Sequence, residues 1–371
     1  MKVPLFRWID RILGPLLIVP VWLFSSLFPK ARLEPKRILV LKLWAMGESI
    51  LTLPLIHAIK KKYPKATITV LARDRVRAVY TGIKDIADVK SAEFFSLFTL
   101  LPLLRRYDLA IDCEPYLNMS ALLAWWLAKR RIGFSHGIRN LLYTDKIAFD
   151  DQKHEALAYM DMAKPLSIEE QPRQLIPVTT SRADEKKVDG LFKEWGIKKS
   201  DTIVCICPGA AESSRGRIWD PKKFAKVADA LVKEFLAKII LIGSKGERPL
   251  AEEVSRAMEY GVINAAGETN VKELAVLLER CALTISNDTG PMHLSAAMGT
   301  PTLGLFCPNT PVRFAPYGPG NAFVYKPVLS KPCINVHKGQ VPDCTGHKHM
   351  SLVTVADVLE KARRMLYARK H

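Results

Sequence analysis

The sequence predicts an α/β protein built from two doubly wound, Rossmann-like domains that face each other across a cleft. Short apolar segments typical of buried parallel strands alternate with amphipathic helices, and this alternation occurs twice along the chain. A polar stretch with two prolines at 171–184 separates the two series, as expected of an interdomain linker. The length of 371 residues is sufficient for two domains, each with a core of its own.

Composition excludes several classes of protein. Hydrophobic residues make up 49% of the chain and charged residues 25%, which excludes a disordered chain and a coiled coil. The seven cysteines are odd in number and scattered, which favours a reducing compartment over a disulfide framework. The net charge of +18 indicates an anionic partner: nucleic acid, an anionic membrane surface or a phosphorylated substrate. Because no nucleic-acid motif accompanies the charge, we expect no nucleic-acid partner.

The N-terminal segment, 1–33, contains an uncharged hydrophobic run at 12–29 with basic residues on both sides. Gly14, Pro15 and Pro20 interrupt the run, and no small-residue cleavage site follows it, so a membrane-spanning helix and a signal peptide are both disfavoured. We expect an amphipathic segment that lies on the anionic cytoplasmic leaflet of a membrane. The alternative is a helix packed on the protein's own surface. The aromatic residues expected in the bilayer are Trp8, Trp22, Phe24 and Phe28.

The first Rossmann-like domain is predicted over 34–172. Strands are expected at 38–43, 66–71 and 107–112, with a helix at 49–63. Glu48 follows Gly47 between the first strand and this helix, at a strand end that faces the cleft. A carboxylate there suits a general base acting on a hydroxyl group. The alternative is a first-turn acid that complements the helix dipole.

The second Rossmann-like domain is predicted over 173–350, and a C-terminal helix over 351–371. Helices are expected to begin near residues 221, 249, 271 and 291. Because ligands of doubly wound sheets bind at the carboxyl ends of the strands, functional residues are expected in the loops that follow them. The strands of this domain are expected at 202–206, 238–242, 282–285 and 302–306.

The most informative of these loops is 286–293, Ser-Asn-Asp-Thr-Gly-Pro-Met-His, between a strand and a helix. Backbone N–H groups at a helix start, with Gly290 allowing close approach, form an anion site suited to a diphosphate. Asp288 suits sugar hydroxyls, and His293 suits a phosphate oxygen. Alternatively, Asp288 is a helix cap and His293 a packed residue, although these roles do not explain the whole combination. We predict a binding loop comprising Asp288, Thr289, Gly290 and His293.

Two further loops carry candidate residues. The loop at 207–219 has small residues, the hydroxyls of Ser213 and Ser214, and two arginines, of which Arg215 or Arg217 would neutralise a diphosphate. In the loop at 243–248, Glu247 suits a ribose hydroxyl. The G-x-G-x-x-G fingerprint follows none of the strands, which counts against a nicotinamide enzyme.

A cluster of soft residues lies late in the chain. Its spacing, Cys-x3-His-x6-Cys-x2-His, is not that of a standard zinc finger, so we predict no metal site and no cofactor. A metal site remains the alternative to a buried loop. The cluster consists of Cys333, His337, Cys344 and His347, with His349 beside it.

Three segments carry a resemblance to a known family: RILVLKLWAMGESILTLP at 37–54, RIGF at 131–134, and SNDTGPMHLSAA at 286–297 followed by Gly-Thr-Pro at 299–301. They resemble glycosyltransferase family 9, the ADP-heptose:lipopolysaccharide heptosyltransferases. The Asp-Thr-Gly-Pro-x-His motif at 288–293 is the most specific part of this resemblance, which extends from about residue 36 to the C-terminus. Pro208-Gly209, Arg217 and Trp219 match as well, as does the late cysteine and histidine stretch.

The resemblance implies a GT-B fold whose C-terminal helix crosses back to the first domain. It implies that Asp288, Thr289, Gly290 and His293 hold the sugar and diphosphate of the donor, that Thr269 flanks the base, and that Glu247 contacts the ribose. The phosphate-contacting residue is usually Lys in this family, and Arg217 is its nearest match. The family's general base is an Asp directly after the glycine of the first loop, whereas this chain has Glu48, whose carboxylate is one methylene further from the backbone.

These implications define the expected function. The chain is expected to be an inverting, metal-independent transferase that moves a heptose from ADP-heptose to the lipopolysaccharide inner core. It would act on a lipid-linked saccharide, peripherally on the cytoplasmic face of the inner membrane of a Gram-negative-type bacterium. The alternatives are a family 9 transferase that uses another nucleotide sugar, and a non-catalytic membrane-associated nucleotide-sugar-binding protein. The second alternative follows from the replacement of Asp by Glu48.

Overall fold

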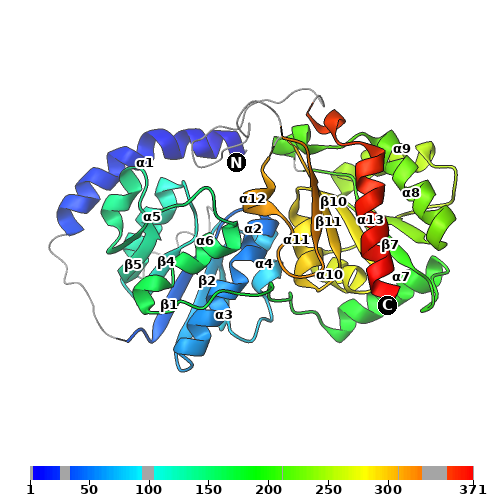
Figure 1. The fold of residues 1–371 in the computed structure, drawn as a ribbon. Helices are drawn as coiled ribbons and strands as arrows, with labels where there is room; N and C mark the ends of the chain where they lie inside the picture. The colour runs from blue at the N-terminus through cyan, green and yellow to red at the C-terminus, as the bar shows by residue number, and fades with distance from the viewer. Residues whose placement is uncertain are drawn as a thin grey trace. The chain divides into compact units, whose positions relative to one another are not determined.

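The computed structural model describes residues 3–25, 34–93, 104–210, 212–307, 309–327 and 349–370. The chain divides into two units, Met1–Pro172 and Arg173–His371. Each unit is built around a parallel sheet with helices beside it (Figure 1). The α/β class and the two Rossmann-like sheets predicted from the sequence are confirmed.

The sheet of the first unit has the order β3-β2-β1-β4-β5-β6 in the described part of the chain, and every neighbouring pair is parallel. Its strands are β1 (Arg37–Leu41), β2 (Thr67–Ala72), β3 (Asp88–Ser91), β4 (Tyr107–Asp112), β5 (Ala128–Phe134) and β6 (Asp145–Ile147). The helices of this unit are α1 (Val3–Ser25), α2 (Met46–Leu51), α3 (Leu53–Lys62), α4 (Asp74–Tyr80), α5 (Asn118–Leu127) and α6 (Glu155–Asp161), with 3-10 turns η2 (Ile138–Leu142) and η3 (Lys164–Leu166).

The second unit repeats this arrangement with the order β12-β11-β10-β7-β8-β9, again parallel throughout the strands that the structure describes. Its strands are β7 (Ile203–Cys207), β8 (Lys238–Leu241), β9 (Ile263–Asn264), β10 (Leu283–Asn287), β11 (Thr302–Phe306) and β12 (Ala322–Tyr325). Its helices are α7 (Arg182–Glu194), α8 (Pro221–Phe235), α9 (Arg248–Ala257), α10 (Val271–Glu279), α11 (Gly290–Ala297), α12 (Pro311–Phe314) and α13 (Val355–Lys370), with 3-10 turns η4 (Glu212–Arg217), η5 (Lys245–Glu247) and η7 (Met350–Leu352).

In both sheets the order of connection reverses once, between β1 and β4 in the first unit and between β7 and β10 in the second. The strands beside these reversals are the apolar runs expected from the sequence, and they are buried almost throughout. The loops at the carboxyl ends of such strands diverge to opposite faces of the sheet, which leaves room for a ligand. The fold therefore places one candidate site in each unit.

The predicted helix at 49–63 differs from the structure in two ways. It begins at Met46, so Glu48 lies in the first turn of α2 rather than in the preceding loop. It also divides at Thr52, where α2 ends and α3 begins. Pro54 explains the division, because it has no N–H to donate to the carbonyl four residues earlier.

The N-terminal helix α1 runs unbroken through Pro15 and Pro20, although these residues interrupt the apolar run of the sequence. Each proline removes one hydrogen bond from a helix of 23 residues, and the remaining bonds maintain it. One face of α1 packs on α5 and η2 (Figure 1). The packing of this face corresponds to the alternative considered for the segment, a helix packed on the protein's own surface. None of the helices described here is long and apolar enough to cross a membrane.

Three residues of α1 explain this packing. Asp10 is buried, and its carboxylate accepts hydrogen bonds from the backbone N–H groups of Asn118 (3.0 Å) and Met119 (2.7 Å) at the start of α5. A Cβ atom on Gly14 would lie 2.4 Å from the Cβ of Asn118, so a larger residue would push the helices apart. Ile18 is fully buried against Leu142 and its neighbours.

The C-terminal helix α13 packs on α8, β10 and β12 of the second unit. Its buried residues Val358, Ala362 and Leu366 join the core of that unit. The crossing of this helix to the first domain concerns the arrangement of the two units and stays a prediction.

The start of α13 is fixed by Asp357, and its replacement should destabilise the second unit. The carboxylate accepts hydrogen bonds from the backbone N–H (3.0 Å) and hydroxyl (2.6 Å) of Thr354, and it pairs with Lys326 at 2.8 Å. The hydrogen bond from Lys326, followed by those from Thr354, lowers the pKa of Asp357 from 3.8 to about 2. We expect Asp357→Ala to lower the free energy of unfolding by about 1 kcal/mol at pH 7.

The pH dependence of this effect has a defined sign. Because the pKa of Asp357 is lower in the folded chain, its stabilisation is present above pH 3.8 and is lost as the pH falls toward 2. Urea unfolding at pH 7 and pH 3 measures the difference, which should be smaller at pH 3. Glu360→Ala, on an exposed position of the same helix, is the matched control. An equal loss for both variants at pH 7 would contradict the assignment.

Candidate active site

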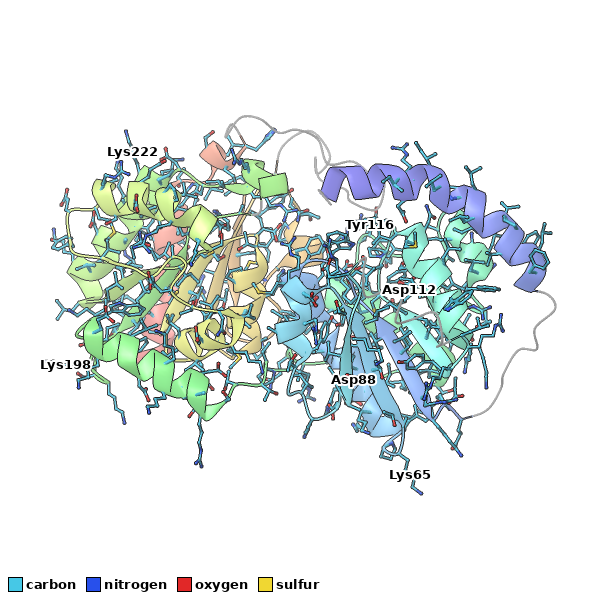
Figure 2. The ribbon with its side chains drawn as sticks, turned by 180° about the vertical axis from the view of Figure 1, so that it is seen from behind. Lys65, Asp88, Asp112, Tyr116, Lys198 and Lys222 are labelled. Atoms are coloured by element: carbon cyan, nitrogen blue, oxygen red, sulfur yellow. The ribbon has the colours of Figure 1, made fainter. Side chains whose placement is uncertain are left out.

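The first candidate site lies at the carboxyl ends of β1 and β4, where the order of the first sheet reverses. Lys42 directly follows β1, and Glu114 follows β4 by two residues. Asp112 and Tyr116 lie at this end of the unit, whereas Lys65, which precedes β2, lies at the opposite end (Figure 2). Neighbouring strand ends thus bring a lysine and a glutamate together.

Lys42, Glu48 and Glu114 form an ion cluster. The Nζ atom of Lys42 lies 2.5 Å from Oε2 of Glu48 and 3.3 Å from Oε1 of Glu114. The side chains of Lys42 and Glu114 are completely buried, while that of Glu48 is 22% exposed. Glu48 is therefore the member of the cluster that is accessible from solvent.

Burial by itself lowers the pKa of Lys42 and raises that of Glu114, and the charge of each group opposes the effect on the other. Burial alone disfavours the ammonium of Lys42, but Glu114 and Glu48 outweigh it and hold the pKa of Lys42 well above 10.5. For Glu114, burial raises the pKa above its usual value, and Lys42 opposes this shift. The lysine is thus firmly protonated beside two carboxyl groups.

A second buried network supports the loop that contains Glu114. The Oδ1 atom of Asp112 accepts the backbone N–H of Glu114 at 3.0 Å. Its Oδ2 atom accepts hydrogen bonds from Arg139 (2.9 Å), Tyr143 (2.6 Å) and Ser120 (2.8 Å). Arg139 also donates to the Tyr143 hydroxyl. The position of Glu114 is therefore set by a buried carboxylate with four donors among the residues described here.

Helix α6 contributes further buried polar groups near this cluster. The ammonium of Lys42 lies 5.8 Å from the ring centroid of Tyr159, and Glu155 on the same helix is 1% exposed. Burial, followed by the charge of Glu48, raises the pKa of Tyr159 well above 10. The sequence analysis did not identify Lys42, Glu114 or these α6 residues. The sequence feature that could have indicated Lys42 is a charged residue at the end of an apolar strand.

The second candidate site lies at the carboxyl ends of β7 and β10, the reversal of the second sheet. Arg217 in η4 pairs with Asp288, with 3.1 Å between Nη1 and Oδ2, and the same nitrogen donates to the Asp288 carbonyl at 3.2 Å. Asn309, after β11, donates to Oδ2 of Asp288 at 2.6 Å. The structure thus joins Arg217 and Asp288, which the sequence analysis proposed separately.

Asn287 holds the two loops of this site together. Its side-chain amide donates to the carbonyls of Pro208 (2.8 Å) and Gly209 (3.3 Å), and its Oδ1 atom accepts the backbone N–H of Trp219 at 3.3 Å. Trp219 is fully buried and donates its indole N–H to Val353. These contacts hold both ends of the loop after β7 against the end of β10. Arg217 lies in this loop, between the two held ends.

Helix α11 begins at this site. Thr289 is its N-cap, but within the described structure its side chain makes no capping hydrogen bond; its hydroxyl lies instead 3.3 Å from that of Ser286. Gly290 is the first helical residue, and His293, three residues later, is 4% exposed. A helix N-terminus without a side-chain cap is suited to an anion. The contact of His293 with a phosphate stays a prediction.

Glu247 lies against the loop after β7. Its Oε2 atom accepts hydrogen bonds from the backbone N–H (2.8 Å) and hydroxyl (2.7 Å) of Ser244, which caps η5. Its Oε1 atom occupies the space of a side chain at Gly209, since a Cβ there would lie 2.1 Å away. Gly209 is thus required by close approach, and Glu247 is placed beside the candidate site.

The remaining predicted residues are more distant or outside the description. Thr269 is half-buried and follows β9, the edge strand two positions from β7. Ser213 and Ser214 lie in η4, but their side chains are outside the described residues. In the described residues no group of three or more His, Cys, Asp or Glu side chains is arranged to hold a metal ion. The cluster of Cys333, His337, Cys344 and His347 lies outside them.

The two sites differ in the chemistry that they support. The first presents a partly exposed carboxylate held by a buried ammonium, which suits proton abstraction from a neutral group. The second presents a guanidinium beside a helix start, which suits a phosphate group.

Known proteins resemble this chain along most of its length. A sequence model of glycosyltransferase family 9 (heptosyltransferase) matches residues 102–339. Lipooligosaccharide heptosyltransferase 2 of Haemophilus influenzae is 25% identical over 342 residues, which cover 86% of this chain and 96% of that protein.

Two solved structures share the fold. A family 9 glycosyltransferase from Veillonella parvula superposes with a TM-score of 0.77 at 22% identity, covering 91% of this chain and 99% of that one. The Escherichia coli ADP-heptose LPS heptosyltransferase II gives a TM-score of 0.73 at 21% identity, covering 90% and 100%. Because the family model matches more than half of the residues, the chain belongs to glycosyltransferase family 9.

Proposed function

We propose that this protein transfers a heptose from ADP-heptose to a lipopolysaccharide inner-core acceptor, with inversion at the anomeric carbon. The observation that carries the proposal is the carboxylate of Glu48, 22% exposed at the reversal of the first sheet and paired with Lys42. The names of its relatives support the sugar and the acceptor: the E. coli structure is named for ADP-heptose and LPS, and the H. influenzae protein for lipooligosaccharide.

In the proposed reaction Glu48 accepts the proton of the acceptor hydroxyl. The oxygen then attacks the anomeric carbon of the heptose from the face opposite the diphosphate, and the bond between that carbon and the diphosphate oxygen breaks. ADP leaves with the electron pair of that bond. Arg217 and the N–H groups at the start of α11 supply the positive charge for the departing diphosphate, the task that a metal ion performs in other transferases. The proposal therefore includes no metal.

Asp288, Thr289, Gly290 and His293 are proposed to hold the sugar and diphosphate of the donor. Glu247 is proposed to contact the ribose, since its carboxylate lies beside Gly209. Thr269 would flank the base, and Ser213 and Ser214 would contact phosphate from η4. The contact of Asn309 with Asp288 adds an amide to this set that the sequence analysis did not include.

We further propose that α1 binds the anionic cytoplasmic face of the inner membrane. The face of α1 opposite Gly14 and Ile18 is apolar and exposed, and residues 1–40 carry seven basic and two acidic residues. Apolar side chains in the headgroup region together with basic flanks are typical of interfacial helices. The exposed residues are Ile12, Leu13, Leu16, Leu17, Val19, Trp22, Leu23 and Phe24.

Glu48→Gln should abolish transfer and leave nucleotide binding intact. Gln keeps the size of the side chain but is a very weak base, whereas Arg217 and α11 are unchanged. The measurements are heptose transfer from ADP-heptose to an inner-core acceptor and ADP binding by calorimetry. Glu48→Asp provides the matched variant, since it keeps the carboxylate. Turnover by Glu48→Gln would remove Glu48 from the role of base, and inactivity of the wild-type protein with every donor would favour the non-catalytic alternative.

Arg217→Met should weaken ADP binding by about 10- to 100-fold, the effect of losing a hydrogen-bonded charge. The control is Arg215→Met, because Arg215 is an exposed arginine of the same 3-10 turn. Titration of both variants with ADP gives the comparison, and UDP and GDP test the choice of nucleotide. Equal weakening by the two substitutions would refute the assignment to Arg217, and tighter binding of UDP or GDP would favour another donor.

Replacing two exposed leucines of α1, Leu16→Asp with Leu23→Asp, should reduce binding to vesicles of phosphatidylglycerol and phosphatidylethanolamine. Leu16 is 66% exposed and Leu23 60%, and seven residues separate them on one face of the helix. Each leucine contributes about 1.5–3 kcal/mol when fully buried, so we expect at least a tenfold loss. Leu236→Asp, at a site 83% exposed in the second unit, is the control in vesicle co-sedimentation. Unchanged binding by the double variant would contradict the proposal.

A further inference from the structure

We propose that Lys42 and Glu114 are positioning residues for the general base, with Lys42 fixing the carboxylate of Glu48 and Glu114 fixing both Lys42 and the loop that precedes Glu48. The proposal rests on the proposed role of Glu48 and adds two residues that do not touch the reactants.

Burying the charges of Lys42 and Glu114 costs free energy. Lys42 and Glu114 are both completely buried. A buried ion pair is weak evidence for stability, because well-packed apolar residues of similar size are often equally stabilising. Through Lys42 this pair is linked to Glu48. Of the two carboxylates that contact Lys42, that of Glu48 is partly exposed and that of Glu114 is buried. The arrangement is thus better suited to holding Glu48 than to stabilising the core.

Glu114 also holds the loop between Lys42 and α2. The Oε1 atom of Glu114 accepts the backbone N–H groups of Leu43 at 2.6 Å and Trp44 at 3.0 Å. The next residue, Ala45, has φ of +63°, a conformation that side chains other than glycine rarely adopt. Such strain persists only where the surroundings enforce it. Glu114 holds the backbone at Leu43 and Trp44 and so enforces this conformation in the loop that precedes Glu48.

Lys42 and Glu114 together fix the position of the Glu48 carboxylate. Glu48 has a long side chain whose carboxylate would otherwise sample several rotamers. Its Oε2 atom is held 2.5 Å from Lys42, and Lys42 is held in turn by Glu114. A displacement of about 1 Å at a reacting group can reduce the rate by about a hundredfold. Holding the carboxylate compensates for the additional methylene that Glu48 has relative to the Asp of the family.

The charges around Glu48 determine how each substitution acts. Lys42 faces it from the end of β1 and Glu114 from the loop after β4. From α6 the neutral Tyr159 lies near Glu48, and Glu155 lies near Tyr159. A nearby positive charge favours the ionised carboxylate, and a nearby negative charge disfavours it. Removing Lys42 and removing the charge of Glu114 should therefore shift the titration of the base in opposite directions.

The experiment compares Lys42→Met, Lys42→Arg and Glu114→Gln in heptose transfer from ADP-heptose across pH. We expect Lys42→Met to lower kcat by about 10- to 100-fold with little change in KM for the donor, and to move the acidic limb of the pH–rate profile to higher pH. Lys42→Arg should restore part of the rate. Glu114→Gln keeps an oxygen for Leu43 and Trp44, so it should lower kcat less and move the acidic limb to lower pH.

The matched control is Lys60→Met, because Lys60 is a partly buried lysine of the same unit that donates to the carbonyl of Ala66. Opposite shifts of the acidic limb support the proposal. Shifts in the same direction, or none, overturn it even where the rate falls, because loss of structure alone predicts no opposite shifts. If Lys42→Met does not fold, as judged by circular dichroism and ADP binding, Glu114→Gln decides: a shift of its acidic limb to lower pH supports the proposal, and no shift or a shift to higher pH overturns it.

The failure of this proposal is distinguishable from the failure of the proposed function. If Glu48→Gln retains turnover, Glu48 is not the base and both fall. If Glu48→Gln is inactive while Lys42→Met keeps the wild-type rate and pH profile, only the positioning role is refuted.

Discussion

The buried charge of Lys42 constrains the whole first unit. An ammonium without water requires anionic partners, and the reversal between β1 and β4 is where the fold supplies them. Glu114 comes from the end of β4 and Glu48 from the first turn of α2, so a strand, a loop and a helix meet at one nitrogen. The same Glu114 carboxylate accepts the N–H groups of the intervening loop. Consequently hydrogen bonds and ion pairs join the loop, the helix start and the partly exposed carboxylate.

The second unit applies the same topology with different chemistry. There the loops after β7 and β10 are joined by the side chain of Asn287, a neutral amide that uses its donors for one loop backbone and its acceptor for Trp219. The charges, Arg217 and Asp288, lie nearer to solvent than Lys42 and Glu114, since Arg217 is 18% exposed. Neutral groups provide the support here, and the guanidinium remains partly exposed, which the proposed contact with a phosphate group requires.

Much of the architecture could be predicted from the sequence because central parallel strands are apolar on both faces, as in β1, β7 and β10. The strand β5 was missed because Arg130 and Arg131 interrupt its apolar pattern; the guanidinium of Arg131 is buried by donating to backbone carbonyls, which no sequence pattern reveals. Glu48, Arg217 and Asp288 were identified from local motifs. Glu114 was not, because its partner Leu43 is 71 residues away and only the strand order brings them together.

The packing of α1 has a consequence for the proposed membrane contact. Asp10 accepts the first N–H groups of α5, and only the short segment 115–117 separates α5 from Glu114. The backbone of Glu114 is in turn held by Asp112, which also accepts a hydrogen bond from Ser120 in α5. A helix bound to the bilayer through its apolar face would therefore orient the carboxyl end of the first sheet, because hydrogen bonds connect Asp10 through α5 to the loop that carries Glu114. The proposed attachment would thus bring the unit that carries Glu48, and not only the N-terminal helix, to the membrane surface at which a lipid-linked acceptor would lie.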